Sequence, residues 1–568
     1  MLSRKPRPTA LPLLLLCLSF REALGLCEKG SATECQGASF VPGAQLAGEG
    51  YDVVTLQTTG AFAVDMESWR DTDGTCTLCR NRLRGGARQR LPTSMADWRT
   101  LSSCQRLLSS QLFRSDVQLA ESAAYAISNN WQQGLSLPIK PGAKANLVLA
   151  GSKSKMVSFG TSRSKSDRYS FTSHQFQCHY YQYRVKDKPL LAPEFARSLS
   201  TLPQELNNAT RPQYKRLVGI YGTHYLRLVE LGGSISDVTA IRTCKVASEG
   251  ITAEEVNDCL ALESGAKVGL AVGGTAGLSR CREMGRSAGL VTNFSQAFGD
   301  RESEVTGGQA MAGRDLLFSG DSTAFARWVE SLTSEPGAVR YALEPLHHLL
   351  PANDTKRKNL QRYISDYIML NALSQQCKAN APCPHGSYRN PRQPCTCLCH
   401  EDSRMDRDCC PVQKGLGHLV VTVKEGRDLW GDVFSGTDGY VVVKYGLTQA
   451  RTNVILNNNN PKWNARLDLG AVRADVGHRL DVEVWDSDRG ARDDVLGSCH
   501  LPLASGTHAQ VCYLKYGKVM LDVSFECGPH LGGATCRHYM PWPNGTSLGP
   551  LLPGSGPGEP PLPKVVFP

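Results

Sequence analysis

The run Tyr221-Gly222-Thr223-His224-Tyr225 is followed, after six residues, by the pair Gly232-Gly233. Because glycine has no Cβ, paired glycines relieve steric limits on the backbone and let a strand bend sharply. The motif therefore indicates a strongly curved β-sheet. We expect His224 to be a buried structural residue rather than a catalytic one.

The start of the chain has the three-part pattern of a secretory signal peptide. Basic residues at positions 4, 5 and 7 precede an apolar run from Leu11 to Leu18, and small residues around Gly25 follow. We expect cleavage near Gly25, which removes residues 1–25. No later stretch reaches the roughly 18 apolar residues of a membrane helix, so we expect the mature chain to be soluble. Its 568 residues, 41% of them hydrophobic, are enough for three or four domains.

Cysteine usage also indicates an exported protein. The chain has 21 cysteines, and Cys17 lies in the predicted signal peptide, which leaves an even number in the mature chain. Seven of them fall within residues 377–410, where a zinc site is the competing interpretation. The spacing Cys395-x-Cys397-x-Cys399 differs from that of paired C-x2-C zinc knuckles, so we favour disulfides. Because seven is odd, one of these cysteines bonds outside the cluster, and Cys244 is the candidate partner.

The formal net charge of +10 favours binding to anionic surfaces. The sequence has no basic patch interleaved with aromatic residues, and an exported protein does not meet nucleic acid, so we exclude that class of partner. Four N-x-Ser/Thr sequons are candidate glycosylation sites: Asn208, Asn293, Asn353 and Asn544.

The glycine-containing motif, in a secreted and cysteine-rich chain, resembles the signature of the membrane-attack-complex/perforin (MACPF) family. Soluble members of that family assemble into rings and push β-hairpins through bilayers. The resemblance covers residues 26–376 and implies an α+β fold, with a bent, twisted antiparallel sheet flanked by helical clusters. We expect disulfides that pin the start of this domain and join Cys104 to Cys178. The full set of expected disulfide cysteines is Cys27, Cys35, Cys76, Cys79, Cys104, Cys178, Cys244, Cys410, Cys499, Cys512, Cys527 and Cys536.

Three further segments follow this domain. Apolar residues at helical spacing from Leu360 to Ile368 predict a helix that begins at Asp354 or Thr355 and ends near Cys377. Residues 377–412 look like a small EGF-like module. Period-2 strands separated by Gly, Asp and Asn turns predict an antiparallel β-sandwich over residues 413–527. The Pro- and Gly-rich tail, residues 528–568, is expected to lack a core of its own, with Cys527 and Cys536 anchoring its first part.

Two acidic loops of the sandwich, about 50 residues apart, follow strand ends and are expected to meet at one tip. Calcium takes six to eight oxygen ligands, mostly from loop carboxylates and carbonyls. Ordinary solvated turn aspartates are the competing interpretation. The arrangement resembles the C2 domain, a calcium-dependent phospholipid-binding module, and the resemblance assigns calcium ligation to Asp432, Asp438, Asp486, Asp488 and Asp494. Secondary candidates are Gly431, Asp493 and Asn457.

The residues expected to touch lipid lie in the same loops: Trp430, Val433, Phe434 and Arg489. Family members carry several exposed aromatic residues at such positions, whereas Val433, Arg489 and Ala491 stand here instead. We expect weaker apolar anchoring, partly replaced by contact of Arg489 and Arg492 with anionic headgroups.

Residues 266–279 alternate in the way a membrane-crossing β-strand does. A polar tip, residues 280–286, and a return strand, residues 288–298, follow. The predicted lipid-facing residues are Ala266, Val268, Leu270, Val272, Leu278, Leu290 and Phe294. An ordinary amphipathic hairpin packed on a core is the alternative. The family resemblance implies that the soluble form holds such segments as helices, and a partner segment is expected around residues 145–180.

Subunit association is expected to use paired charges. By resemblance, Arg216, on the strand before the signature, pairs with Glu344 of a neighbouring copy.

Together these features identify a secreted, calcium-dependent cytolytic protein that binds phospholipid, forms a ring of its own copies and inserts a transmembrane β-barrel. The resemblance implies storage in cytolytic granules and delivery of granule proteases into target cells. A non-lytic adhesion or recognition protein with the same domains is the alternative. A hydrolase is disfavoured because the chain has no Gly-x-Ser-x-Gly and no His-Glu-x-x-His motif.

Overall fold

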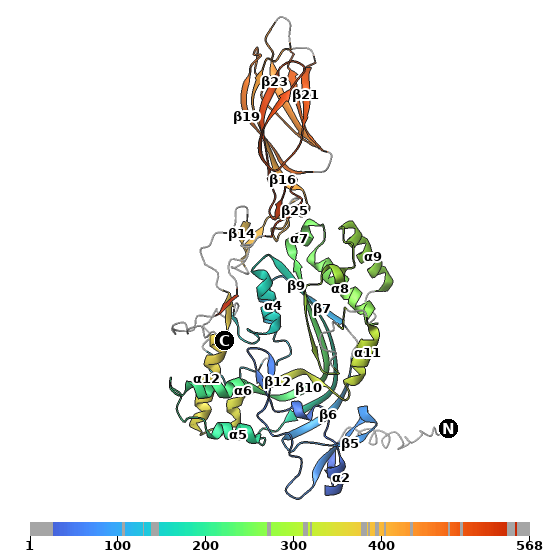
Figure 1. Ribbon diagram of the computed structural model, residues 1–568, viewed down its shortest axis with the longest axis vertical. Coiled ribbons are helices and arrows are strands. Elements are labelled where there is room, and N and C mark those ends of the chain that lie inside the picture. The colour runs from blue at the N-terminus through green and yellow to red at the C-terminus, as the bar shows by residue number, and fades with distance from the viewer. Residues whose placement is uncertain are drawn as a thin grey trace, which may run out of the picture.

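The fold comes from a computed structural model, which describes residues 27–104, 108–128, 130–137, 147–269, 274–309, 316–318, 321–375, 383, 387–391, 397–402, 405–431, 435–474, 478–488, 492–541 and 551–553. Several sequence predictions fall outside these ranges: the signal peptide, Leu270, Val272, Asp432, Val433, Phe434, Arg489 and Asn544. The molecule is elongated, with a large sheet-and-helix domain at one end and a narrow β-sandwich at the other (Figure 1).

An antiparallel sheet of eight strands forms the centre of the large domain. Its order is β3-β2-β10-β9-β6, while β11 and β12 also pair with β10 and β7 pairs with β9. The strands are β2 (Glu49–Asp52), β3 (Gln57–Phe62), β6 (Met95–Ser103), β7 (Leu108–Phe113), β9 (Tyr169–Val185), β10 (His224–Arg242), β11 (Arg301–Thr306) and β12 (Gly337–Pro345). The helices that cover the faces of this sheet precede β9 or follow β10, and β10 begins within the signature motif.

Strand β10 is irregular at the predicted glycine pair. The β9–β10 ladder shifts register between Leu231 and Gly232. A Cβ on Gly232 would lie 1.9 Å from the carbonyl oxygen of Cys178, and one on Gly233 would lie 2.4 Å from Leu332. Neither glycine has a positive φ, so they are required for space rather than for an unusual backbone conformation.

Helices cover both faces of this sheet (Figure 1). Helices α3 (Asp116–Ser122) and α4 (Lys155–Ser164) pack on the face of Phe171 and Val238. On the face of Phe176 and Ile235 lie α7 (Thr243–Ser248), α8 (Ala253–Lys267), α9 (Gly274–Ser287), α10 (Phe294–Ala297) and α11 (Ser322–Ser331). Of residues 266–279, the first two end α8, Val268 and Gly269 form a turn, and residues 274–279 begin α9. No helix in the described ranges has the length and apolar character needed to cross a membrane.

The expected partner segment, residues 145–180, is not one unit. Only its middle part forms the helix α4, and the chain from Tyr169 onward already belongs to the central strand β9. Its aromatic and β-branched residues explain the strand, because Tyr169, Phe171 and Phe176 are buried against the helical clusters.

Helices α5 (Pro193–Ser200), α6 (Arg211–Tyr221) and α12 (Thr355–Asn371) lie together on one side of the large domain, in its half away from the sandwich (Figure 1). The prediction that Arg216 lies on a strand is wrong: it is an exposed residue of α6. Tyr214, Leu217, Val218 and Tyr221 are buried at helical spacing. Helix α12 is capped by Asp354 but ends at Asn371, earlier than expected, because Ala372 is extended.

The start of the domain is a small three-stranded sheet of β1 (Cys27–Gly30), β4 (Cys76–Asn81) and β5 (Ala87–Arg90), with the short helix α2 (Ala32–Gly37) beside it. The disulfides Cys27–Cys79 and Cys35–Cys76 hold it together. Another disulfide joins Cys104 to Cys178 on β9.

The sandwich has two four-stranded sheets, ordered β19-β16-β23-β22 and β18-β17-β20-β21. Its strands are β16 (Leu416–Arg427), β17 (Gly439–Tyr445), β18 (Thr448–Arg451), β19 (Lys462–Arg473), β20 (Leu480–Asp486), β21 (Asp494–Leu501), β22 (Gly506–Tyr513) and β23 (Lys518–Cys527). Alternate residues of both sheets form one apolar core, to which the disulfide Cys499–Cys512 contributes.

The first part of the tail joins the core of the sandwich and does not form one of its own. Leu531 and Cys536 belong to the sandwich core, and Cys536 is bonded to Cys527. This part also forms the two-stranded pair β24 (Leu531–Gly532) and β25 (His538–Tyr539). Farther on, β26 (Leu551–Pro553) pairs with β13 (Leu373–Gln375), which in turn pairs with β8 (Leu147–Val148).

Between the two domains, β14 (Ser387–Arg389) pairs with β15 (Cys397–Cys399). The disulfides Cys383–Cys397 and Cys399–Cys409 hold the described part of this module.

Candidate membrane-docking and insertion sites

The signature histidine is part of the core. The Nε2 atom of His224 lies 3.0 Å from the carbonyl oxygen of Trp131, and its Nδ1 lies 2.7 Å from the hydroxyl of Thr223. Burial lowers the pKa of His224 to about 4, so the ring is neutral at physiological pH. A Cβ on Gly222, whose φ is +74°, would lie 2.4 Å from the carbonyl oxygen of Tyr51. The motif fixes the start of β10 against β2 and offers no catalytic arrangement.

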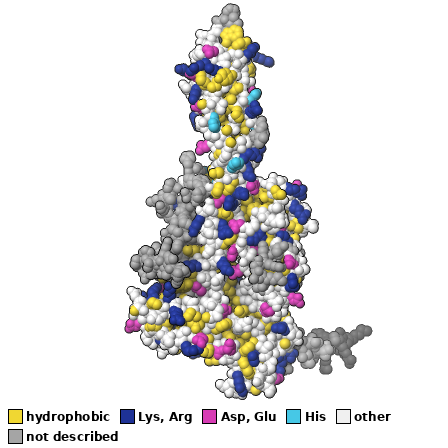
Figure 2. Space-filling model, viewed as in Figure 1, with side chains coloured by type: hydrophobic (Ala, Val, Ile, Leu, Met, Phe, Trp, Pro, Cys, Tyr) yellow, Lys and Arg dark blue, Asp and Glu magenta, His cyan; other side chains and the backbone are white. Residues whose placement is uncertain are grey.

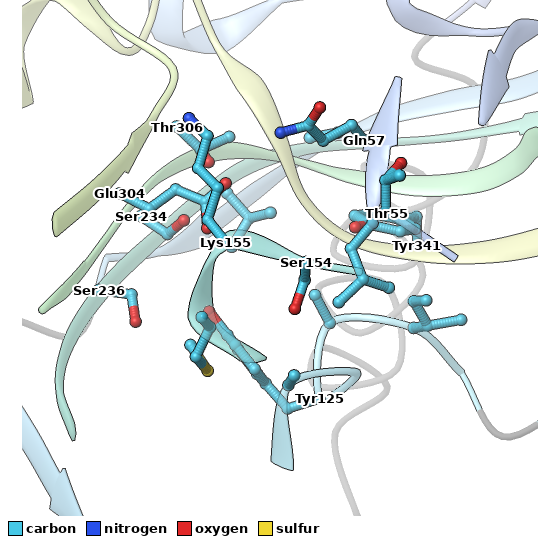
Figure 3. A pocket seen from close by; sticks show the side chains of 17 residues that line it. Thr55, Gln57, Tyr125, Ser154, Lys155, Ser234, Ser236, Glu304, Thr306 and Tyr341 are labelled. Carbon is cyan, nitrogen blue, oxygen red and sulfur yellow. The ribbon is translucent and has the colours of Figure 1, made fainter. Parts of the chain in front are cut away.

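A small cavity of about 80 Å³ lies between the central sheet and the helices α3 and α4, which we call the first helical cluster. Figure 3 shows Lys155 of α4 reaching over β10 and β11, beside Ser234 and Glu304. Burial raises the pKa of Glu304, while the nearby charge of Lys155 opposes that shift. The hydroxyl of Ser236 is buried without a hydrogen-bond partner. The sheet beneath α4 is thus partly polar, and this contact is weaker than an apolar core of the same area.

The second helical cluster, α7 to α11, packs through an apolar core and is also joined by polar contacts between α8 and its neighbours. The carboxylate of Glu263 accepts the backbone N–H groups of Phe294 and Ser295, each at 2.9 Å. Lys267 donates to the hydroxyl of Ser295 at 2.8 Å and to the carbonyl of Phe318 at 2.7 Å. These contacts join the end of α8 to the start of α10.

The predicted lipid-facing residues of this region have different surroundings in the resting fold. Ala266 is exposed, Leu278 and Leu290 are half-buried, and Val268 and Phe294 are buried. Helix α9 buries only Cys281 and Gly285. Helix α9 therefore contributes few fully buried residues to the core.

A disulfide between Cys259 of α8 and Cys281 of α9 ties the two helices together. The sequence analysis missed this pair. The signal was present, because the even cysteine count left these two without an assigned partner.

The two residues predicted to pair between subunits lie in different settings. Arg216 is exposed on α6. Glu344, on β12, accepts a hydrogen bond from Arg227 at 2.9 Å and pairs with His348. Burial alone would raise the pKa of Glu344, but these two hydrogen bonds hold it below its ordinary value. Glu344 thus has partners within its own chain.

The acidic loops of the sandwich meet at the tip distant from the large domain (Figure 1), because β16 runs outward from Leu416 to Arg427 and β20 runs in the same sense to Asp486. The carboxylate of Asp486, only 1% exposed, accepts the backbone N–H of Asp438 at 2.6 Å. Asp438 in turn accepts the N–H of Asn457 at 2.6 Å. These contacts bring three of the predicted ligand positions together.

The glycine at position 431 is dictated by the same carboxylate. A Cβ on Gly431 would lie 1.8 Å from an oxygen of Asp486. Any side chain there would push the carboxylate aside, so the backbone of Gly431 lies directly against it. The predicted secondary ligand thus borders the centre of the acidic cluster.

The remaining acidic residues follow Asp486 along the chain, in the loop to β21 and at its start. Asp493 accepts the hydroxyl of Tyr440 at 2.8 Å and the N–H of Asp488 at 3.2 Å. Asp494 faces Asp486 across the β20–β21 ladder. Within the described residues, no three His, Cys, Asp or Glu side chains are grouped so that they could hold a metal ion. The donors are all oxygens at one tip, which fits a hard cation such as calcium.

Trp430 is an exposed aromatic residue of this tip, and its neighbour Tyr516 is exposed as well. Trp430 is 48% exposed and packs edge-on against Tyr516, with ring centroids 5.0 Å apart. Lysine and arginine side chains are scattered over the visible face of the molecule rather than gathered in one stripe (Figure 2).

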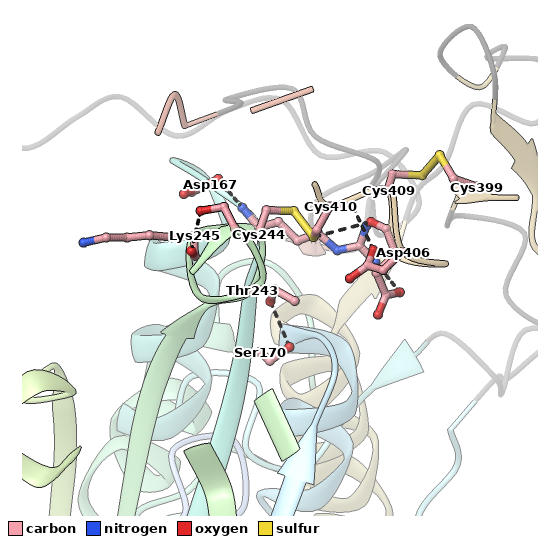
Figure 4. Close-up of a disulfide and its surroundings, with 12 residues drawn as sticks. Asp167, Ser170, Thr243, Cys244, Lys245, Cys399, Asp406, Cys409 and Cys410 are labelled. Carbon is pink, nitrogen blue, oxygen red and sulfur yellow. Dashed lines mark hydrogen bonds and ion pairs between the residues drawn. A yellow bond between two sulfur atoms is a disulfide. The ribbon is translucent and has the colours of Figure 1, made fainter. Parts of the chain in front are cut away.

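The sandwich is fastened to the large domain through the disulfide Cys244–Cys410, which joins α7 to the disulfide-rich module (Figure 4). Next to it, Arg168 pairs with Asp408 at 2.8 Å. From the tail, Tyr539 donates to Asp167 at 2.7 Å. The connection is covalent and polar.

Three of the predicted glycosylation sites are described, and all three are exposed: Asn208, Asn293 and Asn353. The side chain of Asn293 also caps α10 by accepting the N–H of Gln296 at 3.0 Å.

The geometry agrees with comparisons to known proteins. Residues 40–377 match the family model of the MAC/Perforin domain, and residues 417–515 match that of the C2 domain. Human Perforin-1 is 41% identical over 519 residues, which cover 91% of this chain and 93% of that protein. Mouse Perforin-1 is 40% identical over the same shares. The rabbit complement component C8 alpha chain is 27% identical over 32% of each chain. The chain therefore belongs to the MAC/Perforin family.

Proposed function

We propose that this chain is a secreted pore-forming cytolytic protein that docks on phospholipid through its C2 sandwich, assembles with its own copies and inserts β-hairpins into the bilayer. The observation that carries the proposal is the pairing of a bent sheet, flanked by two helical clusters, with a C2 sandwich whose acidic loops lie at the distal tip.

Calcium is the cofactor that this tip fits. Asp432, Asp438, Asp486, Asp488 and Asp494 would hold the ion, and Asp493, Asn457 and the carbonyl of Gly431 are further oxygen donors. Bound calcium supplies positive charge that neutralises the clustered carboxylates and attracts anionic lipid headgroups. The close approach of Gly431 to Asp486 supports this assignment, because a residue without a side chain leaves space beside the carboxylate.

Membrane contact follows from the same tip. Trp430 supplies an exposed ring for the lipid interface. Val433, Phe434 and Arg489 are the further residues proposed to touch lipid. Docking by this tip would place the elongated molecule with its large domain away from the bilayer surface. The hairpin segments then have to extend toward the membrane once they are released.

Assembly brings copies of the chain side by side. Arg216 is a candidate contact because it is exposed on α6. For Arg216 to pair with Glu344 of a neighbouring copy, Glu344 has to give up its contacts with Arg227 and His348. Reversing both charges together should rescue the activity that each single reversal removes, and a double reversal that stays inactive would end this assignment.

Export into cytolytic granules, and co-delivery of granule proteases, belong to the same proposal. Protonated carboxylates do not bind calcium, so the affinity should fall in an acidic granule and recover at neutral pH. Calcium titrations at pH 7 and pH 5 test this, and equal affinities would refute it.

The decisive experiment measures dye release from phosphatidylcholine liposomes across a calcium titration, with co-sedimentation in the same tubes. We expect binding and leakage together, both lost in Asp486→Asn. The matched control is Asp481→Asn, at the other end of the same strand β20, where the carboxylate contacts His500. Binding without leakage would instead identify the non-lytic adhesion or recognition protein. Absence of binding at millimolar calcium would refute the docking step.

A further inference from the structure

Four helices of the second helical cluster lie between two strands that already pair with each other. Strands β10 and β11 form an antiparallel ladder that runs from Ser234 opposite Thr306 to Thr239 opposite Arg301. Throughout this ladder the facing residue numbers add up to 540. The chain between the two strands, residues 243–300, contains the helices α7, α8, α9 and α10.

The disulfide inside this segment has the same register. Cys259 is bonded to Cys281, and these two numbers also add up to 540. If β10 and β11 were simply prolonged, without a bulge or an insertion, Cys259 would lie directly opposite Cys281. The helices α8 and α9 are thus already cross-linked at two positions that would face each other in a continued ladder.

We propose that residues 243–300 refold into one uninterrupted hairpin that continues β10 and β11 in their existing register, and that the Cys259–Cys281 disulfide is retained as a cross-strand link. In this hairpin, residues 260–280 cross the bilayer and the turn falls midway between the cysteines. The inference rests on the proposed pore-forming function and specifies the surface that meets the lipid chains.

The length between the disulfide and the turn matches a bilayer. Ten residues lie between each cysteine and the midpoint, which corresponds to about 33 Å of strand. The hydrocarbon core of a membrane is about 30 Å thick. The disulfide would then lie at the edge of the bilayer.

The distribution of side chains agrees with this length. Facing residues of the ladder share a side of the hairpin, so even-numbered positions lie on one side and odd-numbered positions on the other. Between the cysteines, the even side carries Leu260, Leu262, Ala266, Val268, Ala276 and Leu278. The odd side carries Glu263, Lys267, Thr275 and Ser279. Arg280 is next to Cys281, at the membrane edge.

Charged residues resume immediately outside the disulfide: Asp258 on one strand, and Arg282, Glu283 and Arg286 on the other. Glu263 and Lys267, which anchor α8 to α10 in the resting fold, would face the aqueous lumen after insertion. These two charges of the odd side therefore serve both states without entering lipid.

The register expected from sequence alternation alone does not accommodate the disulfide. A strand over residues 266–279 with its tip at residues 280–286 would place Cys281 about 50 Å from Ala266. Cys259 is seven residues before Ala266 and can reach back about 25 Å at most. That hairpin would require reduction of the disulfide, whereas the continued ladder does not.

Two pairs of exposed positions distinguish these registers. In the continued ladder, Ala266 and Ala276 lie on opposite strands as diagonal neighbours, about 7–8 Å apart. In the alternative they lie on one strand, about 33 Å apart. Arg280 and Ser287 are about 10 Å apart in α9. The continued ladder separates them to about 23 Å on one strand, while the alternative keeps them together at its turn.

The test uses pyrene attached to the double variants Ala266→Cys/Ala276→Cys and Arg280→Cys/Ser287→Cys, diluted with unlabelled protein to exclude contacts between subunits. In leaky liposomes we expect excimer emission from the first pair and loss of excimer emission from the second. The reverse pattern would overturn the register. Failure of the unlabelled protein to leak would instead refute the proposed function.

A second measurement needs no substitution. Pores of the unmodified chain are alkylated, digested without reductant and mapped by mass spectrometry. We expect the peptides of Cys259 and Cys281 to remain joined. Alkylated Cys259 and Cys281 in membrane-inserted protein would overturn the proposal.

Discussion

The bend in β10 can be tested by adding one methyl group at Gly232. A Cβ there would lie 1.9 Å from the carbonyl oxygen of Cys178 and 3.1 Å from the Cα of His179. Both atoms belong to the backbone of β9, which is held by its own ladder and by the disulfide to Cys104. Neither can move away as a flexible side chain would, so the two strands have to separate.

Overpacking a well-filled site costs about 1–3 kcal/mol, and more where the backbone has to move. We therefore expect Gly232→Ala to lower the free energy of unfolding by about 3 kcal/mol or more. The matched control is Gly219→Ala, on the exposed side of α6, where a Cβ meets no atom within 4 Å. Replacing an exposed helical glycine by alanine stabilises by about 1 kcal/mol. The two variants should differ by about 4 kcal/mol.

The assay is urea unfolding of the oxidised protein, followed by tryptophan fluorescence and by circular dichroism. We expect the midpoint of Gly232→Ala to fall and that of Gly219→Ala to rise slightly. Equal stability of the two variants would refute the reasoning, because the glycine would then not be required by the close approach of β9 and β10.

Three further outcomes follow from named contacts. The pKa of an unfolded histidine is near 6.5, whereas that of buried His224 is about 4. The free energy of unfolding should therefore fall as the pH is lowered between these values, by about 1.4 kcal/mol per pH unit for this residue. Thermal melts should show a melting temperature that depends less on pH for His224→Gln but not for exposed His508→Gln. Glu263→Gln should lower the melting temperature by weakening two hydrogen bonds, a loss of about 1–2 kcal/mol; an unchanged melt would show that α10 holds without them. The double variant Cys244→Ser/Cys410→Ser should bind liposomes but leak less, since docking and the sheet lose their covalent link; full leakage would contradict this.

The sequence was most informative where residue spacing has a single physical consequence. Period-2 runs predicted the sandwich strands because alternate residues must face its core, as Val441, Val443 and Val482 do. The odd number of cysteines in residues 377–410 required a bond to another part of the chain, and the structure joins Cys410 to Cys244.

Other features were not readable in this way. Residues 211–221 have apolar residues at helical spacing. Because a strand was expected before the motif, this spacing was overlooked and Arg216 was assigned to a strand. The tail looked coreless by composition, yet Leu531 enters a core built by distant strands, which composition does not reveal.

The insertion segment shows why alternation alone was insufficient. Alternation identifies the two sides of a strand but leaves the turn undetermined, because any turn position preserves the pattern within each strand. A cross-link between two positions removes this freedom. Cys259–Cys281 provides one, and the β10–β11 ladder, which is independent of it, has the same register.

The resting helices and the proposed hairpin also place different demands on the same residues. Helix α9 buries little and contains several glycines, so few contacts oppose its release. Helix α8 buries Val256, Cys259 and Leu260 and is anchored by Glu263, so it is held more firmly. Because the disulfide joins them, α9 cannot extend far alone. Full extension has to include α8, which makes release of the segment a single event. The disulfide thus both specifies which residues face each other after insertion and limits partial opening before it.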